Sequence, residues 1–109
     1  MIDNYPVLEL DDSYYPSVLQ GTTTATIRIG ERANLQPGRF TFKAANAGYL
    51  PLLMNADLII RTTWLGISDH DAQLAGYRDG DHAREDMLQR YPEAKPDTPF
   101  SIIRFSRPA

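Results

Sequence analysis

Apolar and polar side chains alternate along several short segments of this chain, and this pattern predicts β-strands. The alternation is present at residues 5–10 and 39–44, as expected for strands that are buried on one face. A run rich in β-branched and aromatic residues at 57–67 predicts the longest strand. Two further strands are expected at residues 49–54 and 100–105, between turn-forming residues.

Capping residues followed by apolar residues at helical spacing predict two or three short helices. The first helix follows the caps at residues 11–13 and ends at Gly21. The second begins after Ser68 and ends near Gly76, and the third follows Asp79. The third helix is predicted to bury one face, made of Ala83, Met87, Leu88 and Tyr91.

Several short strands at close spacing, with few and short helices, predict the fold class. We expect an α+β protein: a small, mostly antiparallel β-barrel flanked by two or three short helices. The length of 109 residues fits a single domain spanning residues 1–109.

The most informative stretch for function is the segment 21–28, Gly-Thr-Thr-Thr-Ala-Thr-Ile-Arg. It predicts a helix cap, a turn and a strand, and it gathers four hydroxyls and one guanidinium. These groups suit a planar, hydrogen-bonding ligand such as a nucleobase or a phosphate, with Thr23, Thr24, Thr26 and Arg28 as the candidate contacts. The alternative is a purely structural role, because β-branched runs are common in strands of any function.

Composition and charge narrow the classes of function. The net charge of −3 and the sequence pI near 5.2 argue against a protein that holds long nucleic acid by bulk electrostatics, although a small patch can still bind one nucleotide. The absence of cysteine excludes disulfides and thiolate metal sites. No leader and no apolar run long enough for a membrane span is present, so the expected location is the cytoplasm.

Four segments, in order along the chain, resemble one known family. Residues 18–28 are similar to the motif G-x-K-x-x-T-x-R, and residues 35–42 to a segment with Gly-Asp before a strand, here Gly38-Arg39. Residues 65–77 resemble an "Ala-x-x-Glu-Gly-Tyr/Phe" helix, and residues 91–105 a Tyr-Pro followed by a terminal strand. These are features of the ASCH domain family, a branch of the PUA-like β-barrels, and the resemblance covers residues 12–106.

The resemblance also shows what this chain lacks. The bacterial N(4)-acetylcytidine amidohydrolases of the family rely on a Lys, a Thr and a Glu, and the matching positions here are Thr23, Thr26 and Ala75. A threonine hydroxyl needs a neighbouring base to act as a nucleophile. The resemblance therefore implies that the hydrolase activity is lost, or that other residues replace the missing pair.

The remaining candidates have structural alternatives. Asp69, His70, Asp71 and His82 resemble a metal cluster, but the acids lie at an expected helix cap, so no metal and no cofactor are predicted. Among the aromatic residues, Tyr49 is expected to be available to a ligand beside a hairpin tip, whereas Phe40, Phe42 and Trp64 are expected in the core. Arg78, Arg84 and Arg90 are interleaved with acids, as on a solvated helix face, although two of them can face a phosphate.

Three functions stay open at this point. The first is binding of a nucleoside, nucleotide or RNA through Thr23, Thr24, Thr26, Arg28 and Tyr49. The second is hydrolysis of an acylated cytosine or of RNA, with Thr26 as the catalytic residue and Asp69 or Asp71 as its base. The third is a protein-interaction module, such as a phage or mobile-element inhibitor, with a protein partner.

Overall fold

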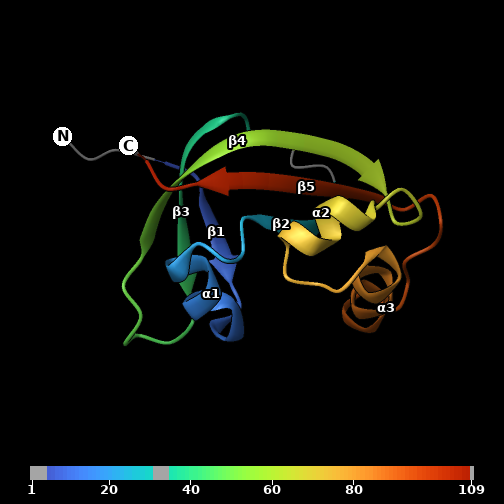
Figure 1. The fold of residues 1–109 in the computed structure, drawn as a ribbon, viewed down its shortest axis with the longest axis horizontal. Coiled ribbons are helices and arrows are strands. Elements are labelled where there is room, and N and C mark those ends of the chain that lie inside the picture. The colour runs from blue at the N-terminus through green and yellow to red at the C-terminus, as the bar shows by residue number, and fades with distance from the viewer. Residues whose placement is uncertain (1–4, 31–34, 109) are drawn as a thin grey trace.

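The computed structural model describes residues 5–30 and 35–108, which contain five strands and three short α-helices (Figure 1). In chain order the elements are β1 (Val7–Leu10), a 3-10 turn (Asp12–Tyr14), α1 (Tyr15–Gln20), β2 (Ala25–Ile29), β3 (Gly38–Ala44), β4 (Leu52–Thr63), α2 (Asp69–Leu74), α3 (Gly80–Arg90) and β5 (Pro99–Ser106). In Figure 1, α1 and α3 lie below the arch formed by β4 and β5.

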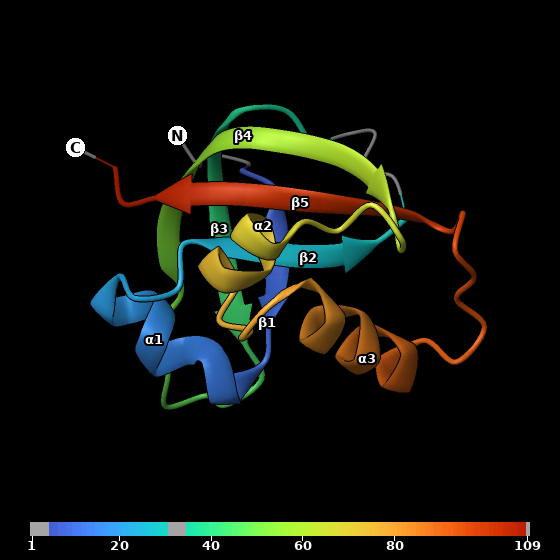
Figure 2. The same ribbon diagram turned by 45° about the vertical axis from the view of Figure 1, so that its right-hand side comes forward.

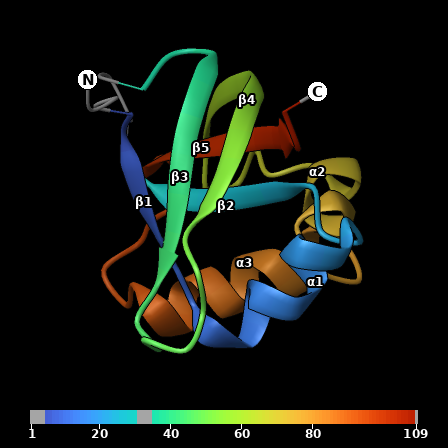
Figure 3. The ribbon, with the colours of Figure 1, turned by 90° about the vertical axis from the view of Figure 1, so that its left-hand side faces the viewer.

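The five strands form one mixed sheet in the order β1-β3-β4-β5-β2. Only the β1–β3 pair is parallel, and the other three pairs are antiparallel. The sheet is strongly curled, so that β1 and β3 stand steeply to β2 and β5 (Figure 3). The expectation of a small, mostly antiparallel α+β barrel with short helices is confirmed, the sheet being a half-barrel with β1 and β2 as its edges.

The strand β5 is buried on both faces and separates two apolar clusters. Ile103 and Phe105 belong to the cluster inside the half-barrel, with Phe40 and Phe42. On the opposite face, Phe100 and Ile102 belong to a second cluster, completed by side chains from β2, α2 and α3. Figure 2 shows α2 in front of β2 and β5, and α3 beside them. The second cluster thus holds α2 and α3 on one face of the sheet, whereas Tyr15 and Val18 of α1 pack into the cluster inside the half-barrel.

The predicted helix boundaries are confirmed by their caps. α1 ends at Gly21, whose φ of 82° is the left-handed conformation that favours glycine. Ser68 caps α2 by accepting a hydrogen bond from the backbone N–H of Asp71, and Asp79 caps α3 by accepting one from His82.

Two sequence expectations are wrong in detail. The strands expected at 49–54 and 57–67 are one continuous strand, β4, with an irregularity between Ala56 and Leu58. β4 ends at Thr63, because a turn follows in which Gly66 N–H donates to the Thr63 carbonyl. Leu88 was expected on the buried face of α3 but is 41% exposed, since that face is narrow and is filled by Ala83 and Met87.

The helices of the described residues give no candidate for a membrane span, as none combines sufficient length with sufficient apolarity.

Candidate functional site

A cleft of about 840 Å³ lies at the open side of the half-barrel, between the edge strands β1 and β2. Residues of β3, α3 and the segment before α1 complete its walls. The polar lining residues include Glu9, Thr23, Thr26, Arg28, Lys43 and Arg90, and the aromatic ones are Tyr14, Phe42, Tyr77, Tyr91 and Phe105. Its volume lies within the usual range of small-ligand sites, roughly 300–1,000 Å³.

Thr26 and Arg28 project from β2 toward the inside of the half-barrel. They alternate with Ala25 and Ile27, which pack into the cluster beneath α2 and α3, so the two polar side chains face the other way. Arg28 Nε donates a hydrogen bond to Thr26 Oγ1 at 3.0 Å, and Arg28 Cζ lies 5.9 Å from the centroid of the Phe42 ring. The guanidinium is therefore held between a hydroxyl and an aromatic ring.

Thr23 and Thr24 have mainly structural contacts. The buried Thr23 hydroxyl donates to Ser17 Oγ at 2.9 Å and so ties the start of β2 to α1, while the residue still lines the cleft. Thr24 is not among the lining residues. Its N–H donates to the Leu74 carbonyl and its carbonyl accepts from Phe105 N–H, both at 2.9 Å.

Tyr49 also lies away from the cleft lining. Its ring stacks on Tyr15, with centroids 4.2 Å apart and planes 5° apart, and it packs against the cluster inside the half-barrel. The stacking partner of this ring thus belongs to the protein itself. The sequence predicts Tyr49 beside a hairpin tip. The residues near Tyr49 in the sequence do not indicate that its ring packs on Tyr15, which belongs to α1.

The positions that match the family lysine and glutamate, Thr23 and Ala75, both line the cleft. Gly76, the residue after Ala75, lies close to Thr23, since a Cβ added at Gly76 would be 3.4 Å from Thr23 Oγ1. The Thr26 hydroxyl accepts a hydrogen bond from Arg28 Nε, and among the described residues no hydrogen bond joins it to a carboxylate or an ammonium group.

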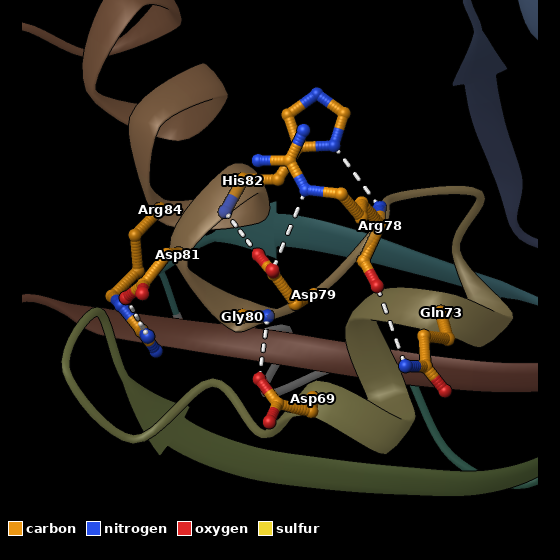
Figure 4. Close-up of polar contacts among 8 residues, drawn as sticks. All are labelled: Asp69, Gln73, Arg78, Asp79, Gly80, Asp81, His82 and Arg84. Carbon is orange, nitrogen blue, oxygen red and sulfur yellow. Dashed lines mark hydrogen bonds and ion pairs between the residues drawn. The ribbon is translucent and has the colours of Figure 1, made fainter.

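The carboxylates proposed as replacement bases are engaged at the helix ends, outside the cleft lining. Asp71 accepts from Arg104 Nε at 2.9 Å and from Ser68 Oγ at 3.0 Å. Asp69 accepts from Gly80 N–H at 2.7 Å and joins α2 to α3 (Figure 4). Their positions fit a structural role.

His82, from the suspected metal cluster, also has a local partner. Its Nδ1 accepts from the Arg78 N–H at 3.0 Å, as Figure 4 shows. Within residues 5–30 and 35–108, no three His, Cys, Asp or Glu side chains are grouped so that they could hold a metal ion.

Sequence reasoning missed a chain of polar contacts that forms one wall of the cleft. Tyr14 Oη donates to Tyr77 Oη at 3.3 Å, and Tyr77 Oη donates to Asp86 at 2.5 Å. Arg90 Nε pairs with the same carboxylate at 3.0 Å, and its Cζ lies 6.0 Å from the Tyr14 ring centroid. Burial, reinforced by the hydrogen bond to Asp86, raises the pKa of Tyr77 well above its ordinary value. Of these contacts, the sequence indicates only the pair Asp86 and Arg90, because their spacing of four residues suits an ion pair on one helix.

Charged residues of β1 and β3 form the rim of the cleft. Glu9 and Lys43 are Cα partners in the parallel pair, and both are exposed. They alternate with buried neighbours, so their side chains share the outer face of the sheet. The pairing of β1 with β3 brings these two residues together, and no pattern within either strand predicts that pairing.

Together these features define a class of protein: a small α+β domain with a mixed, curled sheet and a polar cleft at its open side. The chain is similar to the crystal structure of protein EF3133 from Enterococcus faecalis V583, described under the family DUF984. The TM-score is 0.71 with 16% sequence identity, over 99% of this chain and 78% of that one. It is also similar to the ASCH domain from Lactobacillus crispatus JV V101, with a TM-score of 0.63 and 14% identity, over 87% of this chain and 70% of that one.

At these identities the likeness establishes the fold, and this chain has an ASCH-like fold. Searches of family models and of curated protein sequences gave no match.

Proposed function

We propose that this protein binds a nucleoside, nucleotide or short RNA segment in the cleft and lacks amidohydrolase activity. The observation that supports this most is the common placement of Thr23, Thr26 and Arg28. Thr26 and Arg28 match the ASCH motif, Thr23 stands where that motif has Lys, and all three line one cavity of about 840 Å³.

The chemistry of the lining suits such a ligand. A guanidinium is a rigid fork of donors that fits a phosphate or a base carbonyl, and Arg28 is oriented by Thr26 and Phe42. The rings of Tyr14, Tyr77 and Tyr91 line the same cavity. Bases stack on aromatic side chains with roughly 1–3 kcal/mol each, so the lining offers both charge and stacking.

The proposed loss of hydrolysis follows from the corner that holds Thr23 and Ala75. A hydroxyl and a methyl group replace the ammonium and carboxylate of the related amidohydrolases, and neither removes a proton from Thr26 near neutral pH. The hydrogen bond from Arg28 uses one of the two lone pairs of the Thr26 oxygen.

Titration calorimetry with cytidine, N(4)-acetylcytidine, the four 5′-mononucleotides and short RNAs tests the binding proposal. We expect at least one of them to bind, and Arg28→Ala to weaken that binding about tenfold or more, or about 1.4 kcal/mol. Arg78→Ala is the matched control, because its side chain is 73% exposed outside the cleft lining and carries the same charge. No binding by the wild-type protein, or equal binding by Arg28→Ala, would refute the proposal.

The hydrolase alternative needs its own measurement. Incubation with N(4)-acetylcytidine should release no more acetate from the wild-type protein than from Thr26→Ala. Turnover that disappears in Thr26→Ala, while the variant still unfolds at the wild-type temperature, would restore the hydrolase interpretation.

A further inference from the structure

A second, smaller cavity of about 360 Å³ adjoins the cleft. It is lined by Val7, Glu9, Arg28, Ile29 and Tyr91. All of these except Ile29 also line the cleft, so the two cavities adjoin at residues that they share. Arg28 is one of these shared residues.

The smaller cavity lies where the half-barrel is open. Val7 and Glu9 belong to β1, and Arg28 and Ile29 belong to β2, the two edge strands of the sheet. Because the sheet is curled, β1 stands steeply to β2 at this opening rather than alongside it (Figure 3). We call this opening between the two strand edges the seam.

We propose, building on the function proposed above, that the ligand is a single-stranded RNA segment of at least two nucleotides that passes from the cleft into the seam. Arg28 is the basic residue common to both cavities, which places it at the phosphate that joins two nucleotides. A free nucleoside is smaller than the cleft and leaves the seam unused.

The other seam residues have matching chemistry. The Tyr91 ring is held edge-on to Phe100, with centroids 6.2 Å apart and planes at 70°, and it lines both cavities, so it can stack on the second base. Glu9 borders the seam from the outer face of β1, where its carboxylate accepts hydrogen bonds from a ribose 2′-hydroxyl or an exocyclic amine.

The charge of the protein limits the length of the segment. A net charge of −3 does not support binding along many phosphates, whereas Arg28 suits one. Since single strands lose affinity with a slope of about −0.7 per phosphate neutralised, the plot of log affinity against log salt should have a slope of about −0.7 to −1.4.

The length dependence of binding tests the proposal directly. We would measure the four 5′-mononucleotides against ApA, CpC, GpG and UpU by calorimetry. The expected result is that the dinucleotide of the preferred base binds at least tenfold more tightly than its mononucleotide. Equal affinities would overturn the seam as a subsite and leave the function proposed above standing. If neither kind of ligand binds, and the nucleosides and short RNAs named above do not bind either, the proposed function itself fails. A deoxydinucleotide that binds as tightly as its ribose counterpart would overturn the assignment to RNA.

Ile29 offers a matched pair of variants, because it lines the seam and not the cleft, while also packing against the cluster beneath α2 and α3. Ile29→Glu should reduce the affinity of the dinucleotide to that of the mononucleotide, since a carboxylate repels the phosphate. Ile29→Lys should preserve or increase the advantage of the dinucleotide. Both variants place a charge at the same half-buried position, so a general loss of structure would affect them alike. Equal dinucleotide affinities in the two folded variants would contradict the proposal.

Discussion

The ion pair between Asp71 and Arg104 gives the sharpest test of how this fold is held together. Asp71 Oδ1 lies 2.8 Å from one terminal nitrogen of Arg104 and 2.9 Å from its Nε, and Asp71 Oδ2 accepts from Ser68 Oγ at 3.0 Å. The contact joins α2 to β5, two elements that also share the apolar cluster beneath the helices. We predict that Asp71→Ala destabilises the protein markedly.

The magnitude follows from the burial of the two partners. Removing one member of a fully buried pair costs about 3–5 kcal/mol, because the remaining charge is left without a partner. Here the Asp71 side chain is 9% exposed but the Arg104 side chain is 33% exposed, so the stranded guanidinium keeps part of its hydration. We therefore expect a loss of about 2–3 kcal/mol in the free energy of unfolding.

Urea denaturation followed by the fluorescence of the single tryptophan, Trp64, measures this loss. Asp81→Ala is the control: Asp81 pairs with Arg84 at 2.6 Å, but its side chain is 91% exposed, so the change should stay within about 0.5 kcal/mol. A double-mutant cycle of Asp71→Ala with Arg104→Ala should give a coupling energy between about 0.5 and 3 kcal/mol. If Asp71→Ala is as stable as the wild type, the reasoning is wrong. If it then also abolishes ligand binding or turnover, Asp71 has a functional role instead.

Two further predictions concern the helix ends. Gly21→Ala should lower the free energy of unfolding by about 1 kcal/mol. Gly21 has a φ of 82° and nothing lies within 4 Å of the added methyl group, so conformational strain is the whole effect. A change near zero in urea denaturation would argue against the left-handed cap. At Asp79, the hydrogen bond from the His82 N–H holds the pKa of the carboxyl below its usual range. A lowered folded-state pKa gives stability that is present above the unfolded pKa and is lost as the pH falls through the folded one, so the wild type should lose stability below about pH 3.9. Asp79→Asn, which still caps but does not titrate, should show a smaller loss over the same pH range, and identical pH profiles would contradict this role.

Local chemistry was sufficient for the parts of this protein that depend on neighbours in sequence. Gly21 ends α1, and the side chains of Ser68 and Asp79 cap the first turns of α2 and α3. Each of these effects acts on residues a few positions away in the sequence. The same holds for Thr26 and Arg28, because a spacing of two on a strand places both on one face.

The seam and the polar wall of the cleft required the folded chain. β1 pairs in parallel with β3, and no residue in either strand specifies that partner. The chain from Tyr14 through Tyr77 to Asp86 joins three segments that are distant in sequence. The stacking of the Tyr49 ring on Tyr15, a residue of another element, likewise depends on the folded chain.

The amino-acid pattern by itself determined where the chain turns, which segments are strands or helices, and that hydroxyls and a guanidinium gather on β2, because these depend on backbone preferences over a few residues. Only the tertiary structure decided that the sheet curls without closing, since this depends on the two apolar clusters on opposite faces of β5. The curl brings Arg28 over Phe42, from a strand that is not its neighbour in the sheet, and so makes the cleft.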